Sequence, residues 1–254
     1  MTLPLLRPDW PAPPGVGAAM SLRDGGVSGA PWRSLNLGAA VGDEPLAVAE
    51  NRARWAAALG ARAVWLRQVH GVKVLRLSST SATTPDEPAD AAWTTEPGLA
   101  CTVQIADCLP VLFAARDGRA VAAAHAGWRG LAAGVLEATL SALQQGAGVA
   151  TGELVAWLGP CIGPRQFEVG ADVLEGFGQA PAQADPALFV YSPRSDGAPR
   201  WRANLQQLAK LRLAAAGVVH ISQDPSCTVE DESRFFSFRR DRVTGRLAAA
   251  VWRS

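Results

Sequence analysis

The run from Ala106 to Gly130 constrains the fold more than any other part of the chain. Two apolar segments, Pro110–Ala115 and Ala120–His125, flank the polar sequence Arg-Asp-Gly-Arg at 116–119. An Asp-Gly pair between two apolar runs is a strong short-range signal of a β-hairpin. The sequence therefore predicts two antiparallel strands joined by a two-residue turn at this Asp-Gly pair.

The same hairpin brings a cysteine close to a histidine. Facing residues have numbers that sum to 235, so His125 lies opposite Pro110, and Cys108 is its diagonal neighbour. Side chains alternate along a strand, and diagonal partners lie about 7–8 Å apart. A zinc ion, at about 2.3 Å from sulfur and about 2.0–2.1 Å from imidazole nitrogen, fits between them. Buried cysteines and histidines are also common as packing and hydrogen-bonded residues, so spacing alone leaves both interpretations open.

The composition and charge exclude several classes of protein. The chain has 254 residues, and 24 Lys plus Arg against 23 Asp plus Glu give a net charge of +1. We expect one domain spanning 1–254, and no nucleic-acid partner because there is no broad basic footprint. Without an apolar run of about 20 residues or a signal-peptide core, we expect no membrane contact and a cytoplasmic location. Four cysteines are too few for a disulfide scaffold and should be reduced there.

Hydrophobic periodicity and turn signals divide the chain into strands and helices. Strands are expected at 16–22, 63–69, 72–77, 99–105, 110–115, 120–125, 153–158, 218–222 and 247–252. Helices are expected at 44–59, capped by Asp43, and at 131–145, 171–177 and 203–216. His70 is expected at the end of the strand 63–69. Hairpins and helices mixed without regular alternation indicate an α+β fold.

Short motifs follow one another along nearly the whole chain. They are RDGGVS (23–28), SLNLG (34–38), VGD (41–43), NR (51–52), QVHG (68–71), ADCLP (106–110), HAGWRG (125–130), GPCIG (159–163), CT (227–228), FSFRR (236–240) and TGR (244–246). In this order they resemble the YfiH family of bacterial proteins. Its members are also described as peptidoglycan editing factors, multicopper polyphenol oxidases of the laccase-domain family, and purine nucleoside phosphorylases.

The resemblance implies a fold and a metal site. The fold is a four-layer α/β/β/α sandwich with mixed β-sheets. The metal is one zinc ion, bound by the histidine of QVHG, the cysteine of ADCLP and the histidine of HAGWRG. In this sequence these residues are His70, Cys108 and His125. Three protein ligands with one open position are the pattern of catalytic zinc sites, so the same three residues are the candidate catalytic residues.

Four further residues are candidates for substrate binding, namely Arg23, Asn36, Arg239 and Arg240. The arginines have the charge to bind phosphate, and the aromatic rings beside Arg239 and Arg240 could stack on a flat base. These side chains equally suit structural packing and pairing. Asp107 points away from the face that carries Cys108, which favours a role in loop geometry over that of a base.

The resemblance implies a zinc-dependent purine nucleoside phosphorylase that cleaves adenosine, inosine, guanosine or methylthioadenosine with phosphate and also deaminates adenosine. Copper-dependent phenol oxidation is an alternative, because imidazole and thiolate also suit copper, although three histidines are few for a multicopper centre. A cysteine hydrolase that edits peptidoglycan precursors is another, with Cys108 as nucleophile and His125 as base. A zinc ion that only staples strands together is the non-enzymatic alternative. The sequence leaves the oligomeric state open.

Overall fold

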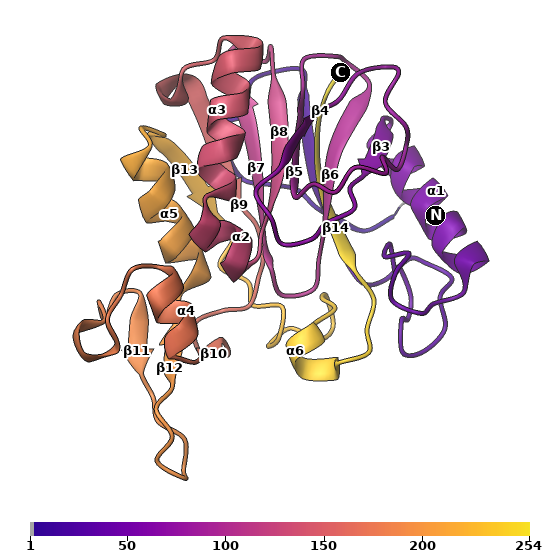
Figure 1. Cartoon of the computed structure of the whole chain (residues 1–254). Coiled ribbons are helices and arrows are strands. Elements are labelled where there is room, and N and C mark those ends of the chain that lie inside the picture. Colours follow the sequence, from indigo (N-terminus) through magenta and orange to yellow (C-terminus); the bar gives the residue numbers. More distant parts are fainter. Residues whose placement is uncertain (1–2) are drawn as a thin grey trace.

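The computed structural model describes residues 3–254, and two stacked β-sheets form its centre (Figure 1). The first sheet contains β1 (Leu5–Leu6), β2 (Val16–Ser21), β3 (Arg62–Trp65), β6 (Leu99–Ile105) and β14 (Leu247–Arg253). The second contains β4 (Val74–Arg76), β5 (Ala91–Thr94), β7 (Leu109–Ala115), β8 (Val121–Ala126), β9 (Leu154–Leu158) and β13 (His220–Gln223). A small third sheet contains β10 (Glu168–Val169), β11 (Phe189–Tyr191) and β12 (Trp201–Ala203).

Helices cover the outer faces and one end of the two large sheets (Figure 1). They are α1 (Pro45–Leu59), α2 (Trp128–Ala133), α3 (Val135–Ala147), α4 (Ala171–Gly176), α5 (Leu205–Ala215) and α6 (Phe238–Asp241), with 3₁₀ turns at Thr151–Glu153 and Pro181–Gln183. α1 packs on the first sheet through Trp55 and Leu59, whereas α3 and α5 pack on the second. The expected α/β/β/α order is therefore confirmed. No helix within 3–254 is long and apolar enough to cross a bilayer.

Both large sheets are mixed. Their strand orders are β1-β2-β14-β6-β3 and β13-β9-β7-β8-β5-β4. The pairs β3–β6, β4–β5 and β9–β13 are parallel, and the other pairs are antiparallel. The α+β class with mixed sheets, expected from the sequence, is thus confirmed.

The central strands are buried on both faces, which explains their nearly continuous apolar sequences. In β7, Leu112 and Ala114 face the first sheet, whereas Val111 and Phe113 face the helices. All four side chains are fully buried. Because side chains alternate along β7, one set packs in the core between the sheets and the other set packs in the core beneath α3.

The hairpin of β7 and β8 has the predicted register, with Pro110 opposite His125. The predicted two-residue turn is wrong. Ala115 N–H donates to the carbonyl of Ala120 at 2.9 Å, so the loop comprises the whole of 116–119. The N–H of Arg116 donates to the carbonyl of Glu153 at 2.9 Å, and it therefore takes no part in the ladder. Facing residues still have numbers that sum to 235, because the loop 116–119 has the same centre as the expected loop 117–118.

Three other elements differ from expectation. The strand expected at 63–69 ends at Trp65, so His70 lies on a loop and not at a strand end. The helix expected at 131–145 begins at Trp128 and breaks at Gly134, whose φ of 101° a helix cannot contain. Asp43 does not cap α1, because its carboxylate accepts hydrogen bonds from Ser28 and Asn36 instead.

Candidate metal centre

The three predicted ligands meet at one end of the stacked sheets. Cys108 lies on the connection from β6 to β7, where the chain crosses from the first sheet to the second. His125 is the penultimate residue of β8, and His70 lies on the loop between β3 and β4. In Figure 1 this end is the lower one, where β8 leads into α2. The fold therefore gathers three distant segments at one point.

The geometry of the cluster fits a single metal ion. One ligand atom from each of His70, Cys108 and His125 lies within 4.8 Å of the others. Nε2 of His70 is 3.8 Å from Sγ of Cys108, and the two imidazole rings are nearly perpendicular at 77°. Tetrahedral zinc with the bond lengths given above places its nitrogen and sulfur ligands about 3.5 Å apart. The three residues can therefore bind a metal with small side-chain shifts.

Asp90 holds both histidines in place, and the sequence analysis missed it. The carboxylate is fully buried, and its Oδ1 lies 2.8 Å from Nδ1 of His125. With Nδ1 donating to the carboxylate, Nε2 of His125 is the nitrogen left to bind a metal. Asp90 also accepts hydrogen bonds from the backbone N–H groups of Val69, His70 and Gly71, at 3.1, 2.9 and 2.7 Å.

The environment of Asp90 favours its charged form. Burial alone would raise the pKa of this carboxyl, but the hydrogen bonds from His125 and Gly71 bring it below its usual value. The local signal in the sequence is faint. It consists of one aspartate placed directly before the apolar run Ala91-Ala92-Trp93, at the end of a polar loop.

Asp107 fixes the connection that carries Cys108. Its φ of 97° is uncommon for a residue other than glycine. Oδ1 accepts a hydrogen bond from the Thr228 hydroxyl at 2.7 Å, and Oδ2 accepts one from the N–H of Arg239 at 2.6 Å. The carboxylate thus braces the backbone beside Cys108, in agreement with the expected role in loop geometry.

Gly127 allows α2 to begin directly against the cluster. A Cβ atom at this position would lie 2.7 Å from Cδ2 of His70 and 3.1 Å from Sγ of Cys108. Both distances are shorter than normal carbon contacts. A glycine is therefore required for the helix start, His70 and Cys108 to approach one another so closely.

Charge on the cluster favours a thiolate at Cys108. Burial raises the pKa of this thiol, but His125 and His70 together lower it to about 6. Burial likewise lowers the pKa of His125, whereas the charges of Cys108 and Asp90 and their hydrogen bonds raise it to about 9. The thiolate is the form that binds metals. By contrast, burial raises the pKa of Cys101 and Cys161, which fits their role as packing residues.

The four candidate substrate-binding residues form hydrogen bonds within the protein that the sequence does not predict. Asn36 is fully buried, and its amide bonds to Gly38, Asp43 and the N–H of Arg246. The guanidinium of Arg240 donates to the carbonyls of Thr228, Val229 and Phe235 and pairs with Asp241. Contact of either side chain with a substrate stays a prediction.

The other two candidates are less fully occupied. Arg23 donates to the carbonyl of Glu232 at 2.8 Å and lies against the Phe236 ring. Arg239 donates to the carbonyl of Glu168 at 3.1 Å and lies over the Phe167 ring. Both keep donors that the protein does not use, and their roles in substrate binding also stay predictions.

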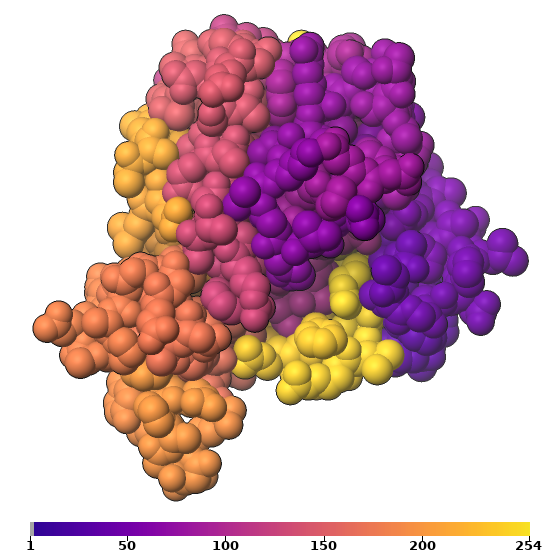
Figure 2. Space-filling model, viewed as in Figure 1, coloured from indigo at the N-terminus to yellow at the C-terminus, as the bar shows by residue number. Residues whose placement is uncertain are grey.

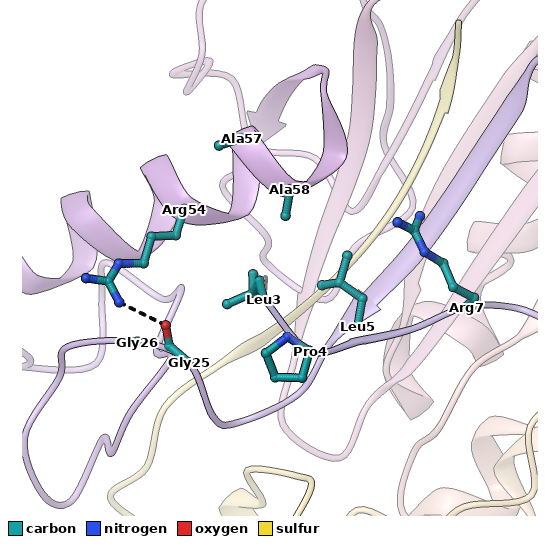
Figure 3. Close-up of a pocket in the computed structure, with 9 residues that line it drawn as sticks. All are labelled: Leu3, Pro4, Leu5, Arg7, Gly25, Gly26, Arg54, Ala57 and Ala58. Carbon is teal, nitrogen blue, oxygen red and sulfur yellow. Dashed lines mark hydrogen bonds between the residues drawn. The ribbon is translucent and has the colours of Figure 1, made fainter. Parts of the chain in front are cut away.

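A separate hollow lies between α1 and the N-terminal segment (Figure 3). Leu3, Leu5, Ala57 and Ala58 form its apolar walls, and Arg54 spans one side to reach the carbonyl of Gly25 at 3.1 Å. None of the metal-site residues lines it. This hollow is therefore separate from the cluster of His70, Cys108 and His125.

Fold and cluster together define the class of this protein, an α/β/β/α sandwich with a cluster of two histidines and one cysteine that could bind a metal. A family described as multi-copper polyphenol oxidoreductase laccase matches residues 17–254. Proteins named YfiH are among the relatives, and the chain belongs to this YfiH family.

Similar proteins cover almost the whole chain. Purine nucleoside phosphorylase PA4543 of Pseudomonas aeruginosa is 51% identical over 97% of this chain and 97% of its own length. Purine nucleoside phosphorylase YfiH of Escherichia coli is 48% identical over 98% of both chains. The crystal structure of protein NMB0706 of Neisseria meningitidis superposes with a TM-score of 0.88 at 41% identity, covering 98% of this chain and 99% of that one.

Proposed function

We propose that this protein is a zinc-dependent purine nucleoside phosphorylase. The observation that carries the proposal is the cluster of His70, Cys108 and His125, whose donor atoms lie within 4.8 Å of one another. Full-length similarity to proteins named purine nucleoside phosphorylase supports the reaction class. We propose adenosine, inosine, guanosine and methylthioadenosine as substrates, with phosphate as co-substrate, and deamination of adenosine as a second activity.

The reaction has defined requirements. In phosphorolysis an oxygen of phosphate forms a bond to C1′ of the ribose. The bond from C1′ to the purine nitrogen breaks, and the purine leaves with a proton. A bound zinc ion supplies an electrophile that polarises oxygen atoms or lowers the pKa of water. Phosphorolysis and deamination can then share one pocket, since deamination requires a hydroxide directed at the purine ring.

Two carboxylates of this chain hold the segments that carry the cluster. Asp90 accepts the hydrogen bond from Nδ1 of His125, which orients that imidazole, and also fixes the backbone of His70. Asp107 holds the connection that presents the Cys108 sulfur. His70 is exposed, whereas His125 is buried. A substrate would therefore approach from the side of the His70 loop.

Two alternatives are not favoured. Copper-dependent phenol oxidation rests on the family description, yet the chain has three histidines, and only two of them belong to the cluster. A metal-free cysteine hydrolase would use the lowered pKa of Cys108 with His125 as base. The names of the relatives support phosphorolysis over both.

The test combines metal content with activity on one untagged sample. We expect about one zinc per chain by mass spectrometry, and hypoxanthine release from inosine plus phosphate. His125→Ala should abolish both, whereas His220→Ala, on the exposed strand β13, should change neither. Copper with phenol oxidation, or full hydrolytic activity in metal-stripped protein, would contradict the proposal. Inosine formation from adenosine without phosphate measures the deaminase activity separately.

A further inference from the structure

Arg246 lies beside the segment that carries Cys108, although it is not among the candidate site residues. Leu247, the first residue of β14, pairs with Ile105, the last residue of β6. The residue before Leu247 therefore lies beside the start of the connection Ala106-Asp107-Cys108. Burial lowers the pKa of Arg246, and the charges of Cys108 and Asp107 offset part of that lowering. Strand register places the backbone of Arg246 beside this connection, and the charge interaction with Cys108 and Asp107 agrees with that placement.

The guanidinium of Arg246 keeps most of its donors free. Nη1 donates to the carbonyls of Thr244 and Gly245, at 3.2 and 3.1 Å. Among residues 3–254 no carboxylate forms an ion pair with it, whereas Arg23 pairs with Glu232 and Arg240 with Asp241. A partly buried cation without an anionic partner is costly, and binding an anion removes that cost.

The ring of Phe238 lies near this guanidinium. The Cζ atom of Arg246 lies 5.8 Å from the centroid of the ring. Phe238 is 47% exposed, whereas Phe235 and Phe236 are fully buried. It begins α6, and the next residue, Arg239, is bound through its N–H to Asp107 at 2.6 Å. The ring is therefore tied to the connection that carries Cys108.

The surface in this region is open. α6 lies at the lower end of the sheets in Figure 1, the end that carries the cluster. Figure 2 shows this yellow segment at the surface, between the N-terminal part of the chain and the orange part. Val69 and Val72, on either side of His70, are 53% and 39% exposed. Arg246 itself is half-buried, so part of its side chain is open to solvent.

We propose that Arg246, oriented by Phe238, binds the phosphate co-substrate. This inference rests on the proposed phosphorylase function and names the residue that recognises its anion. Arginine presents a planar fork of N–H donors that matches two phosphate oxygens, and a cation–π contact with the Phe238 ring restricts where the fork can lie. Phosphate held there lies beside the metal ligands, where it can reach the ribose carbon of a nucleoside in the same pocket.

The test separates phosphate binding from the rest of the reaction. Arg246→Gln should raise the KM for phosphate roughly 10–100-fold, as expected for loss of charged hydrogen bonds. The KM for inosine and the zinc content should stay unchanged, and Arg246→Lys should recover part of the phosphate affinity. Arg76→Gln is the matched control, since Arg76 also stacks on an aromatic ring, Trp93 at 5.3 Å, but on β4.

Each outcome decides the inference. An unchanged KM for phosphate in Arg246→Gln overturns it. Loss of zinc together with activity also overturns it, because the arginine would then support the Cys108 connection and not the substrate. If the wild-type protein shows no phosphorolysis, the proposed function fails, and calorimetric titration with inorganic phosphate still tests the site. Binding that Arg246→Gln abolishes supports the anion site, and equal binding overturns it.

Discussion

At the scale of single residues, the site depends on two buried carboxylates that bind no metal themselves. Asp90 fixes the ring of His125 and the backbone around His70. Asp107 fixes the backbone beside Cys108. His70 and Asp107 both have positive φ, 60° and 97°, and each such conformation costs about 1–3 kcal/mol unless its surroundings impose it. The hydrogen bonds of the Asp90 and Asp107 carboxylates impose these two conformations.

Asp90→Asn should weaken metal binding by roughly 10–100-fold, the usual cost of losing a carboxylate that orients a histidine ligand. A neutral amide holds Nδ1 of His125 less firmly and accepts backbone hydrogen bonds less strongly. Competition with a chelator measures the affinity. Asp86→Asn, on the exposed loop before β5, is the control and should bind metal like the wild type. Equal affinities in the two variants would contradict the role given to Asp90.

The pKa of Cys108 predicts a pH dependence of alkylation in metal-stripped protein. The thiolate is the reactive form, and the pKa of about 6 keeps it populated at neutral pH. The rate of reaction with iodoacetamide should therefore stay high down to about pH 6 and fall below it. A midpoint near the ordinary thiol value of about 8.5 would show that the histidines do not stabilise the thiolate. Peptide mapping identifies the cysteine that reacts.

At the scale of elements, the site needs the start of α2 to lie against two ligands. Gly127 precedes the helix, and Gly134 ends it at a φ of 101° before α3 begins. The break lets α2 take its own direction from the end of β8. Periodicity gives no sign of such a break, because the apolar pattern continues across it. The expectation of one helix at 131–145 failed for this reason.

Gly127→Ala should lower metal affinity while the fold persists. The added methyl carbon would sit 2.7 Å from the His70 ring, and the loop that carries His70 is the part able to move. Metal content after dialysis and the circular dichroism spectrum measure the two effects. Gly29→Ala adds a methyl group where no atom lies within 4 Å, so it should leave both unchanged. Full metal retention in Gly127→Ala would show that the cluster tolerates the displacement.

Local signals in the sequence predicted some elements better than others. The register of the β7–β8 hairpin was predictable because two apolar runs meet at one Asp-Gly pair, and this placed Cys108 near His125. The strand expected at 63–69 was too long, since apolar residues continue past Trp65 into a loop that pairs only through an isolated bridge between Arg67 and Pro88. β5 and α6 were missed because each is four residues long and lacks periodicity.

At the scale of the whole molecule, the position of the site depends on how the two large sheets stack. The connection that carries Cys108 joins β6 in one sheet to β7 in the other, so the separation of the sheets sets the position of its sulfur. The four-layer order came from family resemblance, since strand periodicity does not say which sheet a strand joins. Asp90 meets His125 because β5 and β8 are neighbouring strands of one sheet, a pairing that no local sequence pattern encodes.

Leu112→Ala should destabilise the protein by about 2–5 kcal/mol, the usual cost of a cavity at a fully buried leucine. The side chain fills the core between the two sheets. Urea unfolding of metal-stripped protein measures the change. Leu46→Ala is the control, because Leu46 is 86% exposed and its loss should stay within about 0.5 kcal/mol. Similar midpoints for the two variants would mean that the inter-sheet core relaxes around the cavity.

The three candidate ligands lie in segments that differ in burial and in secondary structure. His125 belongs to a buried strand, and Cys108 directly precedes another, whereas His70 lies on an exposed loop secured at its turn by one carboxylate. If the cluster binds a metal as proposed, the His70 loop is the part of the site that can open with the least disturbance of the sheets. The rate at which an ion leaves would then report the opening of the Asp90 hydrogen bonds and not the unfolding of the sheets.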